Sequence, residues 1–261
     1  MISSPRMNLR LSALFAEGYK SPSQRARRVT EPWGAENLYC CSCASDDLDS
    51  LPNNAHVSDL VCPDCAERYQ LKSQSKRIGG SVLGSNYRKM LEAIAADQTP
   101  HFFLLHYQLP AWLVRDLMLI PKFTITNSVI LPRKPLGETA RRKHWQGYTL
   151  NFSLIPDAAK ISLVAAGVER DPAAVRADFA RIAPVREMNT DQRGWTLDVL
   201  RCVEKIGAAE FTNDQAYAFE GRLSALHPGN RHVRDKVRQQ LQVLRDLGFL
   251  EHVERGRWRR R

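Results

Sequence analysis

The spacing of apolar residues changes along the 261-residue chain, and each spacing predicts a type of element. Residues 8–34 and 86–97 carry apolar side chains at helical intervals. Strands are predicted at 57–61, 67–73, 101–107, 113–120 and 160–165. The segment 101–107 is continuously apolar, which is typical of a central strand covered on both faces. This succession predicts a mixed α/β (α+β) domain.

A polar turn at 189–194 precedes a different pattern and predicts a domain boundary, with one domain at 1–190 and another at 191–261. The tail has three predicted helices, at about 196–206, from Thr212 onward and at about 230–247. Thr212 and Gln215 match a capping box, and Gly248 is placed to end the last helix. Two predicted strands follow, at 249–252 and 257–259. Three helices and a two-stranded wing predict a winged-helix domain.

The last predicted helix has two different faces. One face repeats apolar residues, namely Val233, Val237, Leu241, Leu244 and Leu247. The other face carries long polar side chains that suit base edges and phosphates in a major groove. The DNA-contacting residues predicted in this domain are Asn230, Arg231, Arg234, Asp235, Arg238 and Arg257. A winged helix that contacts another protein is the alternative.

Charge supports a polyanionic partner. The chain has a formal net charge of +10, and its basic residues cluster at 25–28, 133–144 and 255–261. A solvated basic surface would explain any single run, but three runs favour nucleic acid. The middle run contains Arg141, Arg142 and Trp145, which can clamp phosphates and insert an indole at a base step. Alternatively, Trp145 anchors this loop to the core.

Five of the six cysteines lie between residues 40 and 65. Cys40, Cys43, Cys62 and Cys65 form a C-x2-C-x18-C-x2-C pattern, the spacing of a closed tetrahedral zinc site. The second pair is predicted at the tip of a hairpin made by the strands at 57–61 and 67–73. Cys41 is a spare thiol that either replaces Cys40 or packs in the core.

The same predicted hairpin carries residues suited to phosphodiester hydrolysis. Such a reaction needs a divalent cation and a neighbouring positive charge. Asp59 offers a hard oxygen ligand, while Gln70 and Lys72 lie two apart on one strand and therefore face the same side. Glu31 is a candidate for a further carboxylate. A surface ion pair between Asp59 and Lys72 is the alternative explanation.

The sequence lacks an apolar stretch near the roughly 18 residues of a membrane span, and its first residues are amphipathic rather than signal-like. We therefore expect a cytoplasmic protein with no membrane partner. A monomer in solution is expected.

With these residues in view, the chain resembles the DpnI-type methyl-directed type II restriction endonucleases, which join a PD-(D/E)XK catalytic domain to a C-terminal winged helix. The resemblance spans nearly the whole chain. The matching fragments are Tyr19-Lys20-Ser21, Thr30-Glu31-x-Trp33, Tyr39-Cys40-x-x-Cys43, Asp59, Cys62-x-x-Cys65, Leu71-Lys72-Ser73, Arg133-Lys134-Pro135-Leu136, Thr139-Ala140-Arg141-Arg142, Trp145, Arg170-Asp171-Pro172, Arg193-Gly194-Trp195-Thr196, Glu210-Phe211-Thr212, Arg238-Gln239-Gln240-Leu241-Gln242 and Leu244-Arg245-Asp246.

The resemblance implies a bacterial enzyme with structural Zn²⁺ and catalytic Mg²⁺ that cuts duplex DNA at adenine-methylated GATC, reading the site with both domains. One position departs from the family pattern, because Gln70 stands where the family carries an acid. An amide oxygen can bind a cation but brings no charge, so metal binding should be weaker. The alternative function is a zinc-containing winged-helix DNA-binding protein that does not cut.

Overall fold

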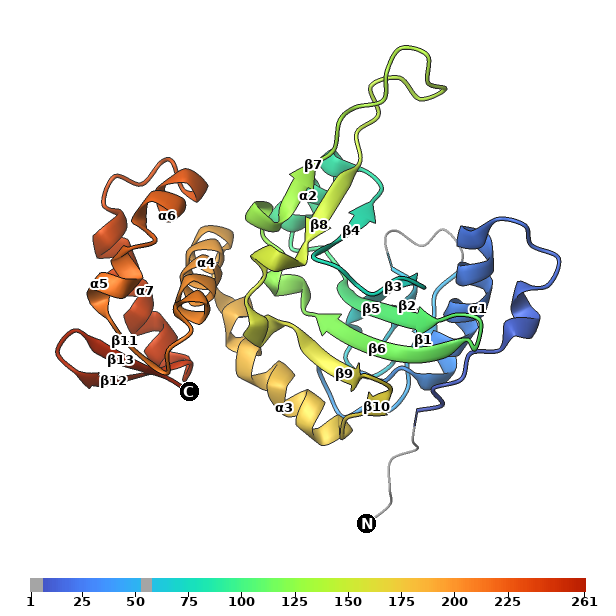
Figure 1. Ribbon diagram of the computed structural model, residues 1–261, viewed down its shortest axis with the longest axis horizontal. Helices are drawn as coiled ribbons and strands as arrows, with labels where there is room; N and C mark the ends of the chain where they lie inside the picture. The colour runs from blue at the N-terminus through green and yellow to red at the C-terminus, as the bar shows by residue number, and fades with distance from the viewer. Residues whose placement is uncertain (1–6, 53–57) are drawn as a thin grey trace. The chain divides into compact units, whose positions relative to one another are not determined.

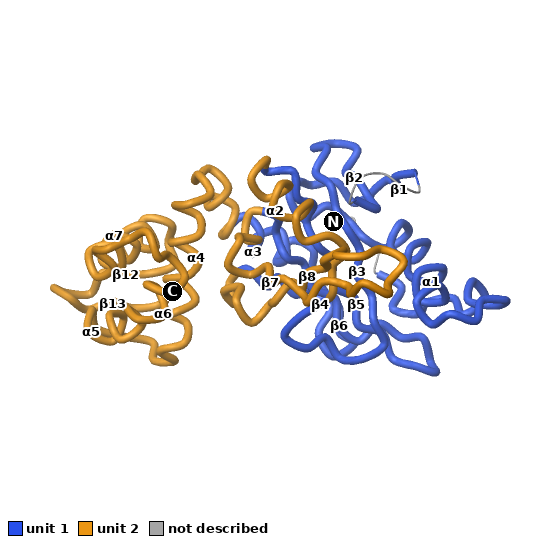
Figure 2. Tube along the Cα trace, turned by 90° about the horizontal axis from the view of Figure 1, so that it is seen from above, with its two compact units in different colours: residues 1–82, 97–122, 159–180 blue, residues 83–96, 123–158, 181–261 orange. Residues whose placement is uncertain are grey.

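The computed structural model describes residues 7–52 and 58–261. By contacts the chain forms two compact units, one of residues 1–82, 97–122 and 159–180, the other of residues 83–96, 123–158 and 181–261 (Figure 2). In the described ranges no helix is both long enough and apolar enough to cross a membrane. The division at residue 190 that the sequence predicts remains a proposal.

The first unit is built on a seven-stranded sheet with the order β1-β2-β3-β5-β6-β9-β10 (Figure 1). Its strands are β1 (Asp49–Ser50), β2 (Leu60–Val61), β3 (Arg68–Gln74), β5 (His101–Gln108), β6 (Leu113–Ile120), β9 (Ile161–Ala165) and β10 (Val168–Glu169). β3 and β5 run parallel, and the other neighbouring pairs run antiparallel. The predicted strands at 67–73, 101–107, 113–120 and 160–165 are confirmed. Residue 57, the predicted start of the other strand, lies outside the described residues.

Helix α1 (Pro22–Asn37) packs against one face of β3. Thr30 Oγ1 lies 3.0 Å from Ser73 Oγ, and a Cβ added to Gly34 would meet Leu71 Cδ2 at 2.9 Å. A larger residue at position 34 would therefore have to displace the end of the Leu71 side chain. Because side chains alternate along a strand, the even-numbered residues of β3 face the other side of the sheet.

The predicted helix at 8–34 is wrong over its first half. Residues 13–16 form only a short 3-10 helix, η1 (Ala13–Ala16), and α1 begins at Pro22. Gly18 adopts a positive φ of 77°, which interrupts helical geometry. Proline fits the first turn of a helix because its missing N–H needs no partner there, so α1 starts after Ser21.

A small sheet is formed, in this order, by β4 (Ser81–Gly84), β8 (Tyr148–Asn151) and β7 (Ile130–Pro132). β8 and β7 lie in the second unit, and β4 spans the boundary at residues 82 and 83. Helix α2 (Tyr87–Ala95) follows β4 and confirms the helix predicted at 86–97. An added Cβ on Gly84 would lie 1.9 Å from Tyr148 Cζ, so only glycine lets β4 approach β8 this closely. The chain between β7 and β8 projects from this sheet as a long loop, residues 133–147, here called the basic loop (Figure 1).

The other elements before the tail are α3 (Pro172–Ile182) and the 3-10 helices η2 (Lys122–Thr124), η3 (Asn127–Val129), η4 (Phe152–Leu154), η5 (Asp157–Ala159) and η6 (Ala183–Glu187). The tail contains α4 (Thr190–Ile206), β11 (Glu210–Thr212), α5 (Asn213–Tyr217), α6 (Glu220–Leu226), α7 (Val233–Asp246), β12 (Leu250–Glu254) and β13 (Arg257–Arg260). Its strands form a sheet in the order β11-β13-β12 beside the helices, which is the predicted winged-helix architecture.

Two helix starts in the tail differ from the prediction. α4 begins at Thr190 rather than near 196, because Asn189 and Gln192 form a capping box inside the predicted polar turn. α7 begins at Val233 rather than near 230, since the Asn230 side chain accepts a hydrogen bond from the His232 N–H. The capping box of Thr212 and Gln215 and the left-handed Gly248 are confirmed.

Candidate functional site

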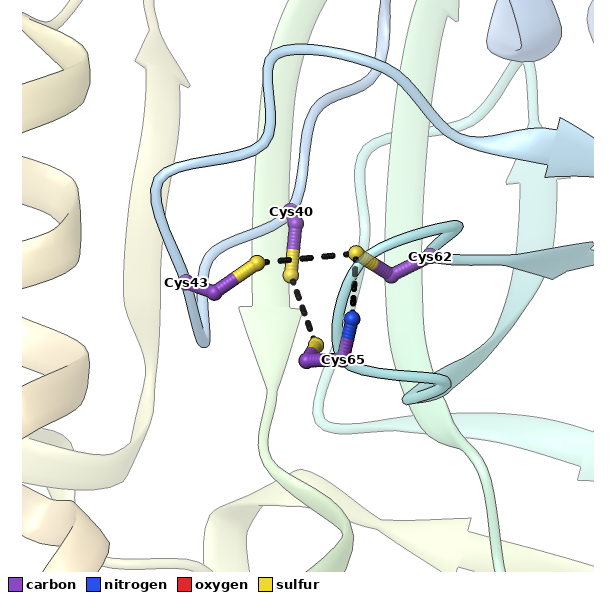
Figure 3. Close-up of side chains that lie close together, drawn as sticks. All are labelled: Cys40, Cys43, Cys62 and Cys65. Carbon is purple, nitrogen blue, oxygen red and sulfur yellow. Dashed lines mark hydrogen bonds between the residues drawn. The ribbon is translucent and has the colours of Figure 1, made fainter.

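Four cysteine sulfurs converge beside the first sheet. The Sγ atoms of Cys40, Cys43, Cys62 and Cys65 all lie within 4.8 Å of one another. Cys40 and Cys65 are separated by 3.6 Å, and Cys43 and Cys62 by 3.5 Å (Figure 3). A tetrahedral zinc ion with Zn–S bonds of about 2.3 Å needs sulfurs about 3.8 Å apart. The four thiols therefore fit zinc, as the spacing predicts.

The fold brings the two cysteine pairs together from opposite sides. Cys40 and Cys43 lie on the loop after α1, whereas Cys62 and Cys65 form the turn between β2 and β3. That turn is closed by the Cys62 N–H, which donates to the Glu67 carbonyl at 2.9 Å. Arg176 of α3 donates to the Cys40 carbonyl at 3.1 Å and so holds the first loop. These two hydrogen bonds, each accepted by a main-chain carbonyl, hold the two cysteine loops without the help of a metal ion.

The thiols differ in how readily they ionise. Burial acts to raise the pKa of Cys62, but the backbone N–H groups of Cys65 and Asp64 outweigh it and lower that pKa to about 7. Burial raises the pKa of Cys40 and of Cys65. Cys41 lies outside the four-sulfur group, and burial raises the pKa of its thiol. Cys41 is therefore a packed core thiol and does not replace Cys40.

A cavity of about 770 Å³ lies at one side of the same hairpin. Its lining includes three of the predicted catalytic residues, namely Glu31, Asp59 and Gln70. They come from α1, from the segment before β2 and from β3, respectively. The cavity is also lined by Phe15, Arg27 and Arg28, which the sequence analysis did not assign to it. Arg27 and Arg28 belong to the basic run at 25–28, which the sequence already marked as a surface for a polyanion.

Asp59 is oriented by the neighbouring strand. Its backbone N–H donates to the Tyr69 carbonyl at 2.9 Å, and its Oδ2 accepts from the Leu71 N–H at 2.9 Å. These two bonds place the Asp59 carboxylate beside the Gln70 position of β3. The assignment of Asp59 and Gln70 as metal ligands stays a prediction.

Lys72 and Glu31 each interact with an oppositely charged side chain. Burial lowers the pKa of Lys72, and the Asp59 carboxylate acts against this shift. The Asp59 charge therefore acts on Lys72, and an ion pair between these two residues stays the alternative to a catalytic role. Glu31 accepts from Arg27 one turn earlier on α1. A cation at Glu31 would therefore compete with the Arg27 guanidinium.

Glu67 lies just before β3, and its carboxylate contacts residues other than those of the Asp59 cavity. Its Oε2 lies 2.7 Å from Lys122 Nζ and 3.2 Å from His101 Nε2. Burial acts to raise the pKa of Glu67, but hydrogen bonds from His101 and Lys122 outweigh it and lower the pKa to about 2. Glu67 is thus a structural anion that cannot supply the charge missing at Gln70.

The residues predicted to contact DNA lie on two surfaces. On the basic loop, Arg141 and Arg142 are exposed, while Trp145 is half-buried against Gly147. On the winged helix, Arg231, Arg234, Asp235, Arg238 and Arg257 are exposed and Asn230 is half-exposed. Asn230 and Arg231 precede α7 rather than forming its first turn.

The winged helix also has a hollow of about 740 Å³. It lies among α5, α7 and the wing, with Arg238, Gln242 and Arg245 on α7 and Asn213 and Tyr217 on α5. The sequence analysis missed Asn213 and Tyr217, because a five-residue helix leaves no periodic signal. Trp258 is buried and donates to Asn213 Oδ1 at 2.8 Å, so this tryptophan is part of the core.

Comparison with known families agrees with this arrangement. The model of the Dam-replacing family, DpnI, matches residues 7–188, which contain the cysteine cluster and the Asp59 cavity. The model of the Dam-replacing HTH domain, DpnI_C, matches residues 191–260, and such a domain implies DNA binding. Membership of this family indicates a restriction endonuclease. With most of its length matched in these two segments, the chain belongs to the DpnI (Dam-replacing) family.

Proposed function

We propose that this protein is a type II restriction endonuclease that hydrolyses adenine-methylated GATC duplexes with Mg²⁺. The single observation that best supports this function is the cavity shared by Glu31, Asp59 and Gln70 beside the zinc hairpin. These three lining residues of a family member carry side-chain oxygens, which suit a hard divalent cation. The methyl-directed specificity rests on the family alone.

Each residue has a distinct role in this proposal. Asp59 and Gln70 are the proposed oxygen ligands for Mg²⁺, and Glu31 adds a second carboxylate. When bound, Mg²⁺ would lower the pKa of the attacking water and offset charge on the scissile phosphate. Lys72 supplies a fixed positive charge near that phosphate, and Arg27 and Arg28 hold neighbouring phosphates at the cavity.

Cleavage of plasmid DNA tests this function directly. The purified protein with Mg²⁺ is expected to cut a plasmid methylated at adenine in GATC and to spare the unmethylated plasmid. Retarded migration of both plasmids without cutting would instead support the alternative, a zinc-containing DNA-binding protein. Equal cutting of both plasmids would retain the nuclease and reject its methyl specificity.

Gln70→Glu is expected to tighten Mg²⁺ binding. The substitution adds a negative charge beside Asp59 at nearly constant volume, and hard cations bind charged oxygens more strongly. The Mg²⁺ concentration for half-maximal cleavage should fall, and calorimetric titration should show tighter binding. Glu36→Gln, an exposed change on the same helix as Glu31, is the control and should alter neither quantity. Weaker binding by Gln70→Glu would reject Gln70 as a ligand.

We propose that the protein recognises methylated adenine at two separate surfaces. Burial of one methyl contributes about 0.8 kcal/mol, or roughly fourfold in affinity, so one contact discriminates poorly. A GATC duplex carries one methyl on each strand, and two contacts would give roughly fifteenfold. We assign one reading to the surface around Trp145 and the other to the winged helix around Arg231, Arg234 and Arg238.

The isolated tail provides the test of the second reading. A fragment of residues 189–261 keeps Asn189, which caps α4. It should bind methylated GATC duplex a few-fold more tightly than the unmethylated duplex. In the full chain, Trp145→Ala should reduce the ratio of methylated to unmethylated cleavage more than it lowers the melting temperature. Equal affinity of the fragment for both duplexes would limit the tail to phosphate binding.

A further inference from the structure

Tyr69 is the second residue of β3 and has no exposed surface. Its ring stacks on His101 and on Phe103, with centroid distances of 5.0 and 5.1 Å. This packing fixes the side-chain direction, so that the hydroxyl lies 3.1 Å from Cys40 Sγ. A buried tyrosine of the first sheet therefore contacts one of the four clustered cysteine thiols.

The direction of this hydrogen bond follows from the chemistry of the site. A zinc-bound Cys40 is a thiolate and can only accept, so the Tyr69 hydroxyl must donate. A tyrosine hydroxyl is protonated at neutral pH, so it has a proton to donate. Four thiolates and one Zn²⁺ carry a net charge of −2, and a donated hydrogen bond offsets part of that charge.

The backbone of Tyr69 faces the other candidate metal site. Its carbonyl accepts from the Asp59 N–H at 2.9 Å, and Leu71, two residues further along β3, donates its N–H to Asp59 Oδ2 at 2.9 Å. Displacement of β3 at Tyr69 would therefore move both the backbone and the carboxylate of Asp59. One residue thus contacts the thiol cluster by its side chain and the proposed Mg²⁺ ligand by its main chain.

We propose that Tyr69 is a positioning residue that links the zinc site to Asp59: its hydroxyl stabilises the Cys40 thiolate, and its carbonyl holds Asp59 in register. The first half of this inference concerns zinc alone. The second half rests on the proposed nuclease function, since it assigns Asp59 to the reaction.

Tyr39 offers a matched control for Tyr69. It is also buried and precedes Cys40 directly, with its ring 5.1 Å from the Arg176 guanidinium carbon. Within the part of the chain that the structure describes, its buried hydroxyl has no hydrogen-bond partner. Phenylalanine at either position removes one buried hydroxyl, but only the change at 69 removes a contact with a zinc-type sulfur.

The test uses Tyr69→Phe and Tyr39→Phe in the full-length protein. Zinc affinity is measured by competition with a chelator, and the thiolate-to-metal charge-transfer band is recorded after cobalt substitution. Loss of a residue that hydrogen-bonds to a metal ligand typically lowers metal affinity by about 10- to 100-fold. Tyr69→Phe should weaken zinc by about tenfold and shift the cobalt band, while Tyr39→Phe should change neither.

A further measurement needs no substitution, in case Tyr69→Phe fails to fold. In the parent protein loaded with NMR-active cadmium, a slowly exchanging hydroxyl proton of Tyr69 should show coupling to the metal through Cys40. Absence of that coupling, unchanged zinc affinity in Tyr69→Phe, or equal losses in both variants would each overturn the zinc half of the proposal.

The link to Asp59 is tested by Mg²⁺ titration of zinc-saturated Tyr69→Phe. A rise of a few-fold in the Mg²⁺ concentration needed for half-maximal cleavage is expected, without a change in DNA affinity. An unchanged Mg²⁺ requirement would overturn this half alone. If the parent protein does not cleave DNA, the proposed function fails, and with it the Asp59 half, whereas the zinc affinities still decide the other half.

Discussion

Replacement of Asp59 by asparagine is expected to abolish DNA cleavage while leaving DNA binding intact. The amide keeps an oxygen that can accept from the Leu71 N–H, now 2.9 Å from Oδ2, so the local backbone is preserved. The lost negative charge is the change that matters for a divalent cation. Removing one group that stabilises transition-state charge typically costs about 10²- to 10³-fold, and loss of a metal ligand should cost at least as much.

Lys72→Met, which removes the proposed positive charge near the scissile phosphate, is likewise expected to abolish cleavage and to leave DNA binding intact. Methionine retains an unbranched apolar stem in this largely buried position but cannot carry a proton. Single-turnover cleavage should fall by a similar factor, with little change in melting temperature. Asp47→Asn, an exposed change on the same segment as the first cysteine pair, is the control. Normal cleavage by either Asp59→Asn or Lys72→Met would remove that residue from the mechanism.

The four-cysteine cluster could be predicted from sequence because its signals are local. Two C-x2-C pairs specify a tetrahedral site, and the turn at Cys62 and Cys65 joins adjacent strands. Strand alternation then placed Gln70 and Lys72 on one side of the strand.

The rest of the fold depends on contacts that sequence spacing does not encode. The sheet of β4, β8 and β7 joins segments more than 40 residues apart through the Gly84 and Tyr148 contact, and no periodicity signals that pairing. Apolar residues before Gly18 suggest a helix, yet a single left-handed residue interrupts it. Likewise, Tyr69 looks like any strand aromatic until its hydroxyl is seen beside Cys40.

The clearest consequence of the cysteine cluster is that the protein should contain one tightly held zinc per chain. β2 pairs with β3 through only two registered residue pairs, Leu60 with Tyr69 and Val61 with Arg68, so the hairpin has little stability of its own. Structural zinc contributes about 10–16 kcal/mol in small zinc-binding peptides. Metal analysis should find one zinc, and strong chelators should lower the melting temperature and abolish cleavage.

Cys62→Ser is therefore expected to lose zinc and activity together, whereas Cys41→Ala should retain both, because Cys41 lies outside the four-sulfur group. Zinc must displace protons from Cys40 and Cys65, whose pKa values burial raises. Lower pH favours those protons, so zinc affinity should fall as the pH is lowered. A zinc-free preparation that remains folded and cuts DNA would show that the hairpin holds Asp59 in place without metal. A Cys62→Ser protein with normal zinc content would reject Cys62 as a ligand.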